Sequence, residues 1–188
     1  SDHLWGDFLV AEGLVDPDKH KALNEHYYRQ YQQGQLDIDE YLSFALGPMA
    51  GMTPETLSAL QDKFLKRHVE PILLDAAFDL LQAHRVKGDT LIIITATNPL
   101  VTQPIANRLG VEHLIGCEAE LEDGRYTGKP EGVPSYGEGK VQRIKAWCAE
   151  HQTSFEGAVF YSDSHNDLPL LREVAQAIAV DPDDLLRV

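Results

Sequence analysis

The segment TLIIITATN, residues 90–98, decides the fold class of this chain. Its short continuous apolar run is typical of a strand covered on both faces, and Pro99 then suits the first turn of a helix. AVFYS at residues 158–162 and AIAV at residues 177–180 are further apolar runs of this kind, again separated by helical patterns. Strands that alternate with helices predict an α/β fold with a Rossmann-like parallel sheet.

The chain before this segment shows only helical signals. Thr53 has the character of an N-cap, followed by Pro54 at the first helical position. The pair Glu70-Pro71 should break the helix that begins there. We therefore predict a mainly helical part over residues 1–71 and an α/β part over residues 72–188.

The remaining elements of the α/β part follow from turn residues and apolar spacing. Asp123-Gly124 is a hairpin-turn pair, and Gly13, Gly34 and Gly88 are expected to end helices. The loop at 128–140 is rich in glycine and proline and is expected to be an ordered surface loop near a site. Helices are predicted at 99–109, at 139–151 and from Asn166, with an apolar segment at 114–121.

Charge and composition exclude several classes of partner. The 188 residues carry 30 Asp and Glu against 16 Lys and Arg, a formal net charge of -14, which disfavours nucleic acids and anionic membrane surfaces. No apolar run reaches the ~20 residues that span a bilayer, and no signal-peptide pattern is present. The two cysteines form no CxxC pair, so we expect a reduced, cytoplasmic protein.

Polar side chains collect where the predicted strands end. Thr95 to Asn98 follow the first strand, and the turn SDSHND at residues 162–167 follows the second. Ligands bind at the carboxyl ends of parallel strands, and Lys140, at the start of the intervening helix, can reach the same place. Helix capping explains part of the turn, but one cap suffices and Asp163, Ser164, Asn166 and Asp167 compete for it.

Carboxylate oxygens of this kind suit Mg²⁺ better than the other common metals. A calcium loop that starts at Asp163 would need Gly at Leu168 and Glu at Val174. A zinc site at His165 lacks HExxH, and the other histidines are scattered. The GxxxxGK[ST], GxGxxG and GxSxG motifs are all absent, so no P-loop, dinucleotide fingerprint or nucleophile elbow is present.

The order of these sites resembles the second, third and fourth motifs of the haloacid dehalogenase superfamily of phosphatases. LIIITATNPLVTQPIANRLGVEHLIG, DGRYTGKPEG and FYSDSHNDLPLL are similar to the phosphoserine-phosphatase-like branch, subfamily IB. The resemblance covers most of the chain and is specific for the superfamily rather than for a substrate. It implies that the helical part, residues 1–71, is a cap inserted in the core.

The resemblance also implies roles for individual residues. Thr95, with Ala96 beside it, and Asn166 would contact the phosphoryl group, and Lys140 would hold the nucleophile and the phosphate charge. Asp163 would ligate Mg²⁺, and Asp167 would support the metal shell or Lys140. In the family an aspartate attacks the phosphoryl group and a second one, two residues later, acts as acid and then base.

The family's first motif, an apolar strand followed by DxDx[TV], has no match in these residues. Asp16-Pro-Asp18 and Asp37-Ile-Asp39 have the spacing but resemble helix starts, and Asp181-Pro-Asp183 is interpreted as a turn. We expect the natural protein to extend upstream, and these 188 residues alone to be inactive. Without that strand the sheet would keep unpaired edges and an open slot.

The resemblance thus predicts a magnesium-dependent phosphomonoesterase of a small phosphorylated metabolite, with phosphoserine and histidinol phosphate as candidate substrates. An inactive phosphate- and metal-binding protein and a phosphotransferase of the same superfamily are the alternatives. No residue of the cap is assigned to specificity, because Trp5, Tyr27, Tyr28 and Arg29 suit packing or the surface equally well.

Overall fold

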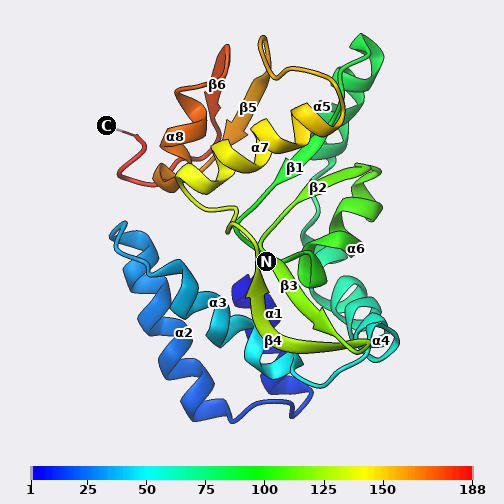
Figure 1. Cartoon of the computed structure of the whole chain (residues 1–188), viewed down its shortest axis with the longest axis vertical. Helices are drawn as coiled ribbons and strands as arrows, with labels where there is room; N and C mark the ends of the chain where they lie inside the picture. Colours follow the sequence, from blue (N-terminus) through cyan, green and yellow to red (C-terminus); the bar gives the residue numbers. More distant parts are fainter. Residues whose placement is uncertain (1, 188) are drawn as a thin grey trace.

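Helices fill the first part of the chain, and strands occur only from Ile92 onward in the computed structural model, which describes residues 2–187 (Figure 1). The α-helices are α1 (Asp2–Ala11), α2 (Pro17–Gln32), α3 (Ile38–Leu46), α4 (Pro54–Phe64), α5 (Asp75–Lys87), α6 (Pro99–Leu109), α7 (Glu138–Glu150) and α8 (Leu168–Leu171). The strands are β1 (Ile92–Ile94), β2 (His113–Ile115), β3 (Glu118–Glu122), β4 (Arg125–Glu131), β5 (Val159–Ser162) and β6 (Gln176–Ala179). Short 3-10 or π turns lie at Gly47–Met49, Leu65–Val69, Glu70–Ile72 and His165–Asp167. We call α1 to α4 the helical layer.

The strands form three separate pairs among the described residues. β1 pairs with β2 in parallel, from Ile92 opposite His113 to Ile94 opposite Ile115. β5 pairs with β6 in parallel, from Val159 opposite Gln176 to Ser162 opposite Ala179. β3 and β4 form an antiparallel hairpin, so the predicted parallel strands of an α/β fold are present.

Local capping signals set the helix ends as predicted. Thr53 caps α4 by accepting a hydrogen bond from the Thr56 backbone N–H at 3.3 Å, with Pro54 in the first turn. Gly88 ends α5 in the left-handed region at φ 82°, where a glycine avoids the steric cost of a side chain. The Asp123-Gly124 turn also has positive φ at both residues and joins β3 to β4.

Three predicted elements differ in extent. The apolar segment at 114–121 is divided between β2 and β3, which belong to different strand pairs. The expected loop at 128–140 begins later, because β4 continues to Glu131, with Pro130 tolerated on a hairpin strand. The helix expected from Asn166 is a 3-10 turn followed by the four-residue α8.

One hydrophobic core joins the helical layer to the α/β part. The rings of Trp5, Phe8 and Phe64 pack together, with Trp5 to Phe64 ring centroids 5.1 Å apart. Val101 of α6 and Cys117 belong to the same buried cluster. Trp5 is thus a packing residue, and the helical layer has no core separate from α6; a domain division at residue 71 stays a prediction.

The two cysteines are buried in different clusters as free thiols. Cys117 lies in the core shared with the helical layer, and Cys148 of α7 packs in a second cluster with Ile115. Burial raises the pKa of the Cys117 thiol to about 11 and also raises that of Cys148. Neither thiol is therefore ionised at neutral pH.

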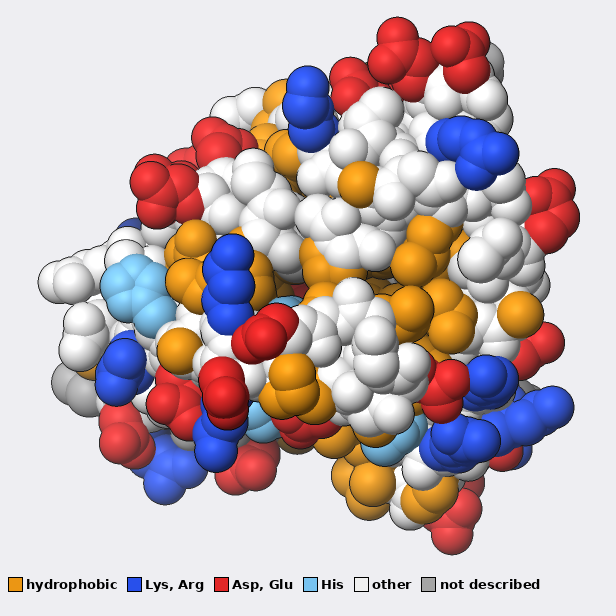
Figure 2. Space-filling view, turned by 90° about the horizontal axis from the view of Figure 1, so that it is seen from below, with side chains coloured by type: hydrophobic (Ala, Val, Ile, Leu, Met, Phe, Trp, Pro, Cys, Tyr) orange, Lys and Arg blue, Asp and Glu red, His pale blue; other side chains and the backbone are white. Residues whose placement is uncertain are grey.

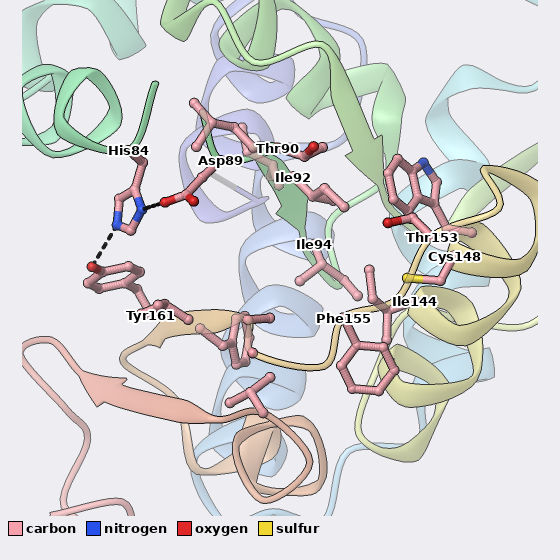
Figure 3. Close-up of a pocket in the computed structure, with 18 of the residues that line it drawn as sticks. His84, Asp89, Thr90, Ile92, Ile94, Ile144, Cys148, Thr153, Phe155 and Tyr161 are labelled. Carbon is pink, nitrogen blue, oxygen red and sulfur yellow. Dashed lines mark hydrogen bonds and ion pairs between the residues drawn. The ribbon is translucent and has the colours of Figure 1, made fainter. Parts of the chain in front are cut away.

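An open slot separates the two parallel strand pairs. β1 and β5 each have one paired edge, and neither pairs with another described strand on the other edge. Between them lies a cavity of about 480 Å³, lined by apolar side chains of β1, β5, α5 and α7. Figure 3 shows Ile92, Ile94, Ile144 and Phe155 around it, and His84 closes one side by hydrogen bonds to Asp89 and Tyr161. The sheet thus has the unpaired edges and the slot that were expected.

The surface carries charges of both signs. Figure 2 shows acidic and basic side chains interspersed with apolar ones on the face seen from below. Across residues 2–187, none of the helices has both the length and the apolar character that crossing a membrane requires.

Gly128 offers a test of how β4 packs on the helical layer. A Cβ at Gly128 would lie 3.0 Å from the Ala50 Cβ, whereas one at Gly124 would meet no atom within 4 Å, and both residues have positive φ. We expect Gly124→Ala to lower the free energy of unfolding by about 1 kcal/mol through backbone strain alone. Gly128→Ala should cost about 1–2 kcal/mol more, measured by urea unfolding. Equal losses for the two variants would contradict this packing.

Candidate active site

The six side chains predicted to form the site all line one cavity of about 260 Å³. The cavity lies where β1 ends at Ile94 and β5 ends at Ser162. The predicted lining residues are Thr95, Ala96, Lys140, Asp163, Asn166 and Asp167. The carboxyl ends of the two parallel strands thus meet at one place, as expected for this class of sheet.

Lys140 is a buried cation at the centre of the site. It is 5% exposed, and its Nζ lies 2.6 Å from Asp167 Oδ1 and 3.5 Å from the Ile94 carbonyl oxygen. Gly139 precedes it, and a side chain there would overlap the Pro134 carbonyl oxygen, so the first turn of α7 packs tightly on the loop. A lysine buried in this way needs a partner charge, which Asp167 provides.

Both carboxylate oxygens of Asp167 have partners. Oδ1 faces Lys140, and Oδ2 accepts a hydrogen bond of 2.7 Å from the Ser162 hydroxyl. Of the two roles expected for Asp167, this geometry suits support of Lys140. Direct ligation of a metal by Asp167 stays a prediction.

Asp163 has an open carboxylate in the same cavity. It is an exposed residue, and no hydrogen bond or ion pair of its side chain is found among residues 2–187. Those residues contain no group of three or more His, Cys, Asp or Glu side chains placed to hold a metal by themselves. Mg²⁺ commonly uses one or two carboxylates and completes its shell with water and substrate phosphate, so Asp163 fits it.

The loop after β1 presents small polar groups to the cavity. The Thr95 hydroxyl accepts a hydrogen bond from the Thr97 backbone N–H at 3.1 Å, which leaves its proton for a ligand. Ala96 lines the cavity without filling it. The Thr97 hydroxyl donates to Asp2 Oδ2 at 2.8 Å and so ties this loop to the start of α1.

Tyrosines that we did not predict link this cavity to the helical layer. The Tyr31 hydroxyl of α2 lies 2.7 Å from the Ser164 hydroxyl. The Tyr136 hydroxyl donates to Asn166 Oδ1 at 2.7 Å, and Asn166 Nδ2 lies 3.5 Å from the Tyr31 carbonyl oxygen. Asn166 therefore connects the site turn, residues 162–167, to α2 and also lines the cavity.

These tyrosines keep their phenolic protons at neutral pH and can donate hydrogen bonds. Burial raises the pKa of Tyr136 to about 12, with the nearby Tyr31 and Asp167 adding to it. Burial also raises the pKa of Tyr31, against the opposing effect of hydrogen bonds from Ser164 and Asn166. Nothing in the sequence near Tyr136 singled it out, because its partner lies 30 residues away along the chain.

Asp183 and His165 stabilise the turn at residues 162–167 through hydrogen bonds to each other and to the backbone of the turn. The His165 backbone N–H and ring Nδ1 lie 2.9 Å and 2.7 Å from Asp183 Oδ2, and the Asp183 backbone N–H donates to the Asp163 carbonyl at 2.8 Å. Burial acts to raise the pKa of Asp183, but the hydrogen bonds from His165 and Leu186 outweigh it and hold that pKa below its usual value. The turn at 181–183 thus anchors the backbone that carries Asp163.

Tyr31→Phe tests the link between α2 and the site turn. We expect a loss of about 1 kcal/mol in the free energy of unfolding, because the hydrogen bond between the Tyr31 and Ser164 hydroxyls is lost while Ser164 keeps its bonds from Asn166. Urea unfolding measures it, with Tyr126→Phe as the comparison, since no hydrogen bond of the Tyr126 hydroxyl is described. Equal stability of the two variants would contradict the link.

Comparison with known proteins matches this chain to the family model of haloacid dehalogenase-like hydrolases over residues 1–172. A histidinol-phosphatase of Neisseria meningitidis is 41% identical over 187 residues, which cover 97% of this chain and 84% of that protein. A probable phosphatase of Mycobacterium tuberculosis is 35% identical over 138 residues, and this chain spans 48% of its length.

Solved structures agree in fold. A Bordetella pertussis protein described as of unknown function has a TM-score of 0.90 and 40% identity, covering 99% of this chain and 85% of that one. A phosphoserine phosphatase, solved as an analogue of its phospho-aspartyl intermediate, has a TM-score of 0.68 at 16% identity and supports the fold alone. It covers 99% of this chain and 81% of that one.

Proposed function

This chain belongs to the haloacid dehalogenase-like hydrolases, a family that includes phosphatases, and we propose that it forms most of a magnesium-dependent phosphomonoesterase for small phosphorylated metabolites. The observation that carries the proposal is the 260 Å³ cavity in which buried Lys140, open Asp163 and Thr95 converge. A formal net charge of -14 would repel a phosphate, so a site that binds a phosphoryl group needs a local cation. Buried Lys140, held by Asp167, can supply that cation.

Each side chain of the site has its own role in binding the phosphoryl group. Lys140 places positive charge beside it, with Asp167 fixing the direction of the ammonium group. The Thr95 hydroxyl and the Asn166 amide contact its oxygens, as the family resemblance implies. Asp163 would hold Mg²⁺, which neutralises charge on the phosphoryl oxygens when it is bound. Positioning and electrostatics are the main protein contributions to this class of reaction.

The nucleophile would come from a strand that fills the slot between β1 and β5. A strand there completes the hydrogen bonding of both free edges and ends beside Lys140 and Asp163. One of its aspartates attacks phosphorus as the ester P–O bond breaks, which gives an aspartyl phosphate. A second aspartate protonates the leaving alcohol and then takes a proton from the water that hydrolyses the intermediate.

The experiment is a phosphate-release screen on the natural polypeptide, with and without Mg²⁺, over phosphorylated amino acids, amino alcohols and sugars. We expect release to require Mg²⁺ and to be greatest for histidinol phosphate or phosphoserine, the candidate substrates. Binding of phosphate and Mg²⁺ without turnover would instead support the inactive binding protein. Product formation that depends on an added alcohol acceptor would support the phosphotransferase.

A further inference from the structure

A second cavity, which we call the leaving-group cleft, continues from the site toward α2 and α3. Its volume is about 520 Å³, within the range of small-molecule sites. It shares with the 260 Å³ cavity Asp2, Tyr31, Ala96, Thr97, Asp163 and Ser164. A phosphoester whose phosphate lies beside Lys140 would therefore extend its alcohol into this cleft.

One face of α2 forms the far wall of the cleft. Asn24, Tyr27, Tyr28 and Tyr31 all line it, at helical positions i, i+3, i+4 and i+7. Such a stripe usually packs into a core, but Tyr28 is 55% exposed. Tyr41 of α3 adds a fourth ring, 5.6 Å from that of Tyr27. The wall is thus aromatic and open to a ligand.

The charged side chains that line the cleft are mainly acidic. Four aspartates line it, namely Asp2, Asp163, Asp183 and Asp184; Asp183 pairs with His165, and His3 also lines the cleft. None of its described lining residues is a lysine or an arginine. Lys140, which lines the neighbouring cavity, is already paired with Asp167. Negative charge and aromatic faces together favour a cationic group and disfavour an anionic one.

Asp2 stands between the two cavities and lines both. Burial raises the pKa of this carboxyl, while hydrogen bonds from Thr97 and Tyr41 oppose the rise. Those donors hold the Asp2 carboxyl group in place where the two cavities meet. A cation on the leaving alcohol would offset the cost of its partial burial.

We propose that the leaving-group cleft selects phosphate esters of amino alcohols that carry a protonated amine and no carboxylate. The amine lies among the carboxylates, and a planar group on the alcohol packs against the tyrosines of α2. A substrate such as phosphoserine brings its own carboxylate into a cleft that is lined by four aspartates and by no described lysine or arginine. This inference rests on the proposed phosphatase function and names the substrate class of that site.

The test compares kcat/KM of the natural polypeptide for histidinol phosphate, phosphoserine and p-nitrophenyl phosphate, whose leaving group has no ammonium or carboxylate. We expect histidinol phosphate to exceed phosphoserine by about tenfold or more, because like charges repel across a partly desolvated site. Asp184→Lys puts a cation on the exposed rim of the cleft and should reduce that ratio about fivefold at low salt. Glu150→Lys, at the end of α7 and outside the cleft, changes the net charge equally and should leave the ratio unchanged.

The outcomes separate the two claims. Hydrolysis of p-nitrophenyl phosphate with equal rates for histidinol phosphate and phosphoserine would overturn this inference and leave the phosphatase function standing. A ratio that falls equally in both lysine variants would also overturn it, because the effect would then come from net charge. Absence of Mg²⁺-dependent phosphate release from all three esters would overturn the phosphatase function and this inference with it.

Discussion

Lys140→Ala should lower kcat for phosphate release about 100- to 1,000-fold, the loss typical when one preorganised electrostatic group is removed from an active site. Lys140 Nζ lies 2.6 Å from Asp167 Oδ1, and no other lysine or arginine among the described residues lines the 260 Å³ cavity. Its removal takes away the cation that we propose to face the phosphoryl group. Steady-state phosphate release by the natural polypeptide measures the effect.

The same change also leaves Asp167 buried without its partner. Unfolding should become easier by about 3–5 kcal/mol, since an unpaired buried charge is costly. Lys145→Ala is the matched control, because Lys145 lies on the same helix and pairs only at the surface with Glu173. If Lys140→Ala kept the activity of the Lys145→Ala variant, Lys140 would not belong to the phosphate site.

Asp163→Asn should lower Mg²⁺-dependent activity at least about 100-fold at fixed metal concentration, because the variant keeps the shape of the side chain but loses the open carboxylate charge. A titration of phosphate release with Mg²⁺ should show the midpoint moving to higher concentration. The exposed position and the absence of a described side-chain partner predict little change in unfolding.

The control for this variant is Asp181→Asn, an exposed aspartate in the turn that precedes Asp183. Asparagine tolerates the positive φ of 46° at this position as well as aspartate does. We expect its Mg²⁺ titration to match that of the unmodified protein. Coincident titrations for Asp163→Asn and Asp181→Asn would remove Asp163 from the metal site.

Local sequence signals predicted the α/β fold well. The run at 90–98 contains β1, Pro99 begins α6, and Asp123-Gly124 makes the hairpin turn. Each depends on neighbouring residues, so the sequence alone carries it. The extension of β4 to Glu131 depends instead on pairing with β3, and the shared core of α1, α4 and α6 depends on packing between distant segments.

The part of the site that lies at the carboxyl ends of the strands could be predicted from the sequence. The rule that ligands gather at the carboxyl ends of parallel strands selected the loops after β1 and β5, and Thr95 and Asp163 line one cavity. The contribution of Tyr31 to the site was not predicted, because a tyrosine stripe on a helix has the same spacing whether it packs in a core or lines a cleft. Asp183 was interpreted as a turn residue, and its link to His165 and the Asp163 backbone is visible only in three dimensions.

The central claim is that a strand in the slot between β1 and β5 supplies the carboxylate that this site serves. The direct measurement is intact and peptide mass spectrometry of the natural polypeptide, quenched in acid during turnover with Mg²⁺ and substrate. We predict a mass increase of one phosphoryl group on an aspartate outside residues 1–188. A phosphoryl group on Asp2, Asp163 or another carboxylate within these residues would contradict the claim.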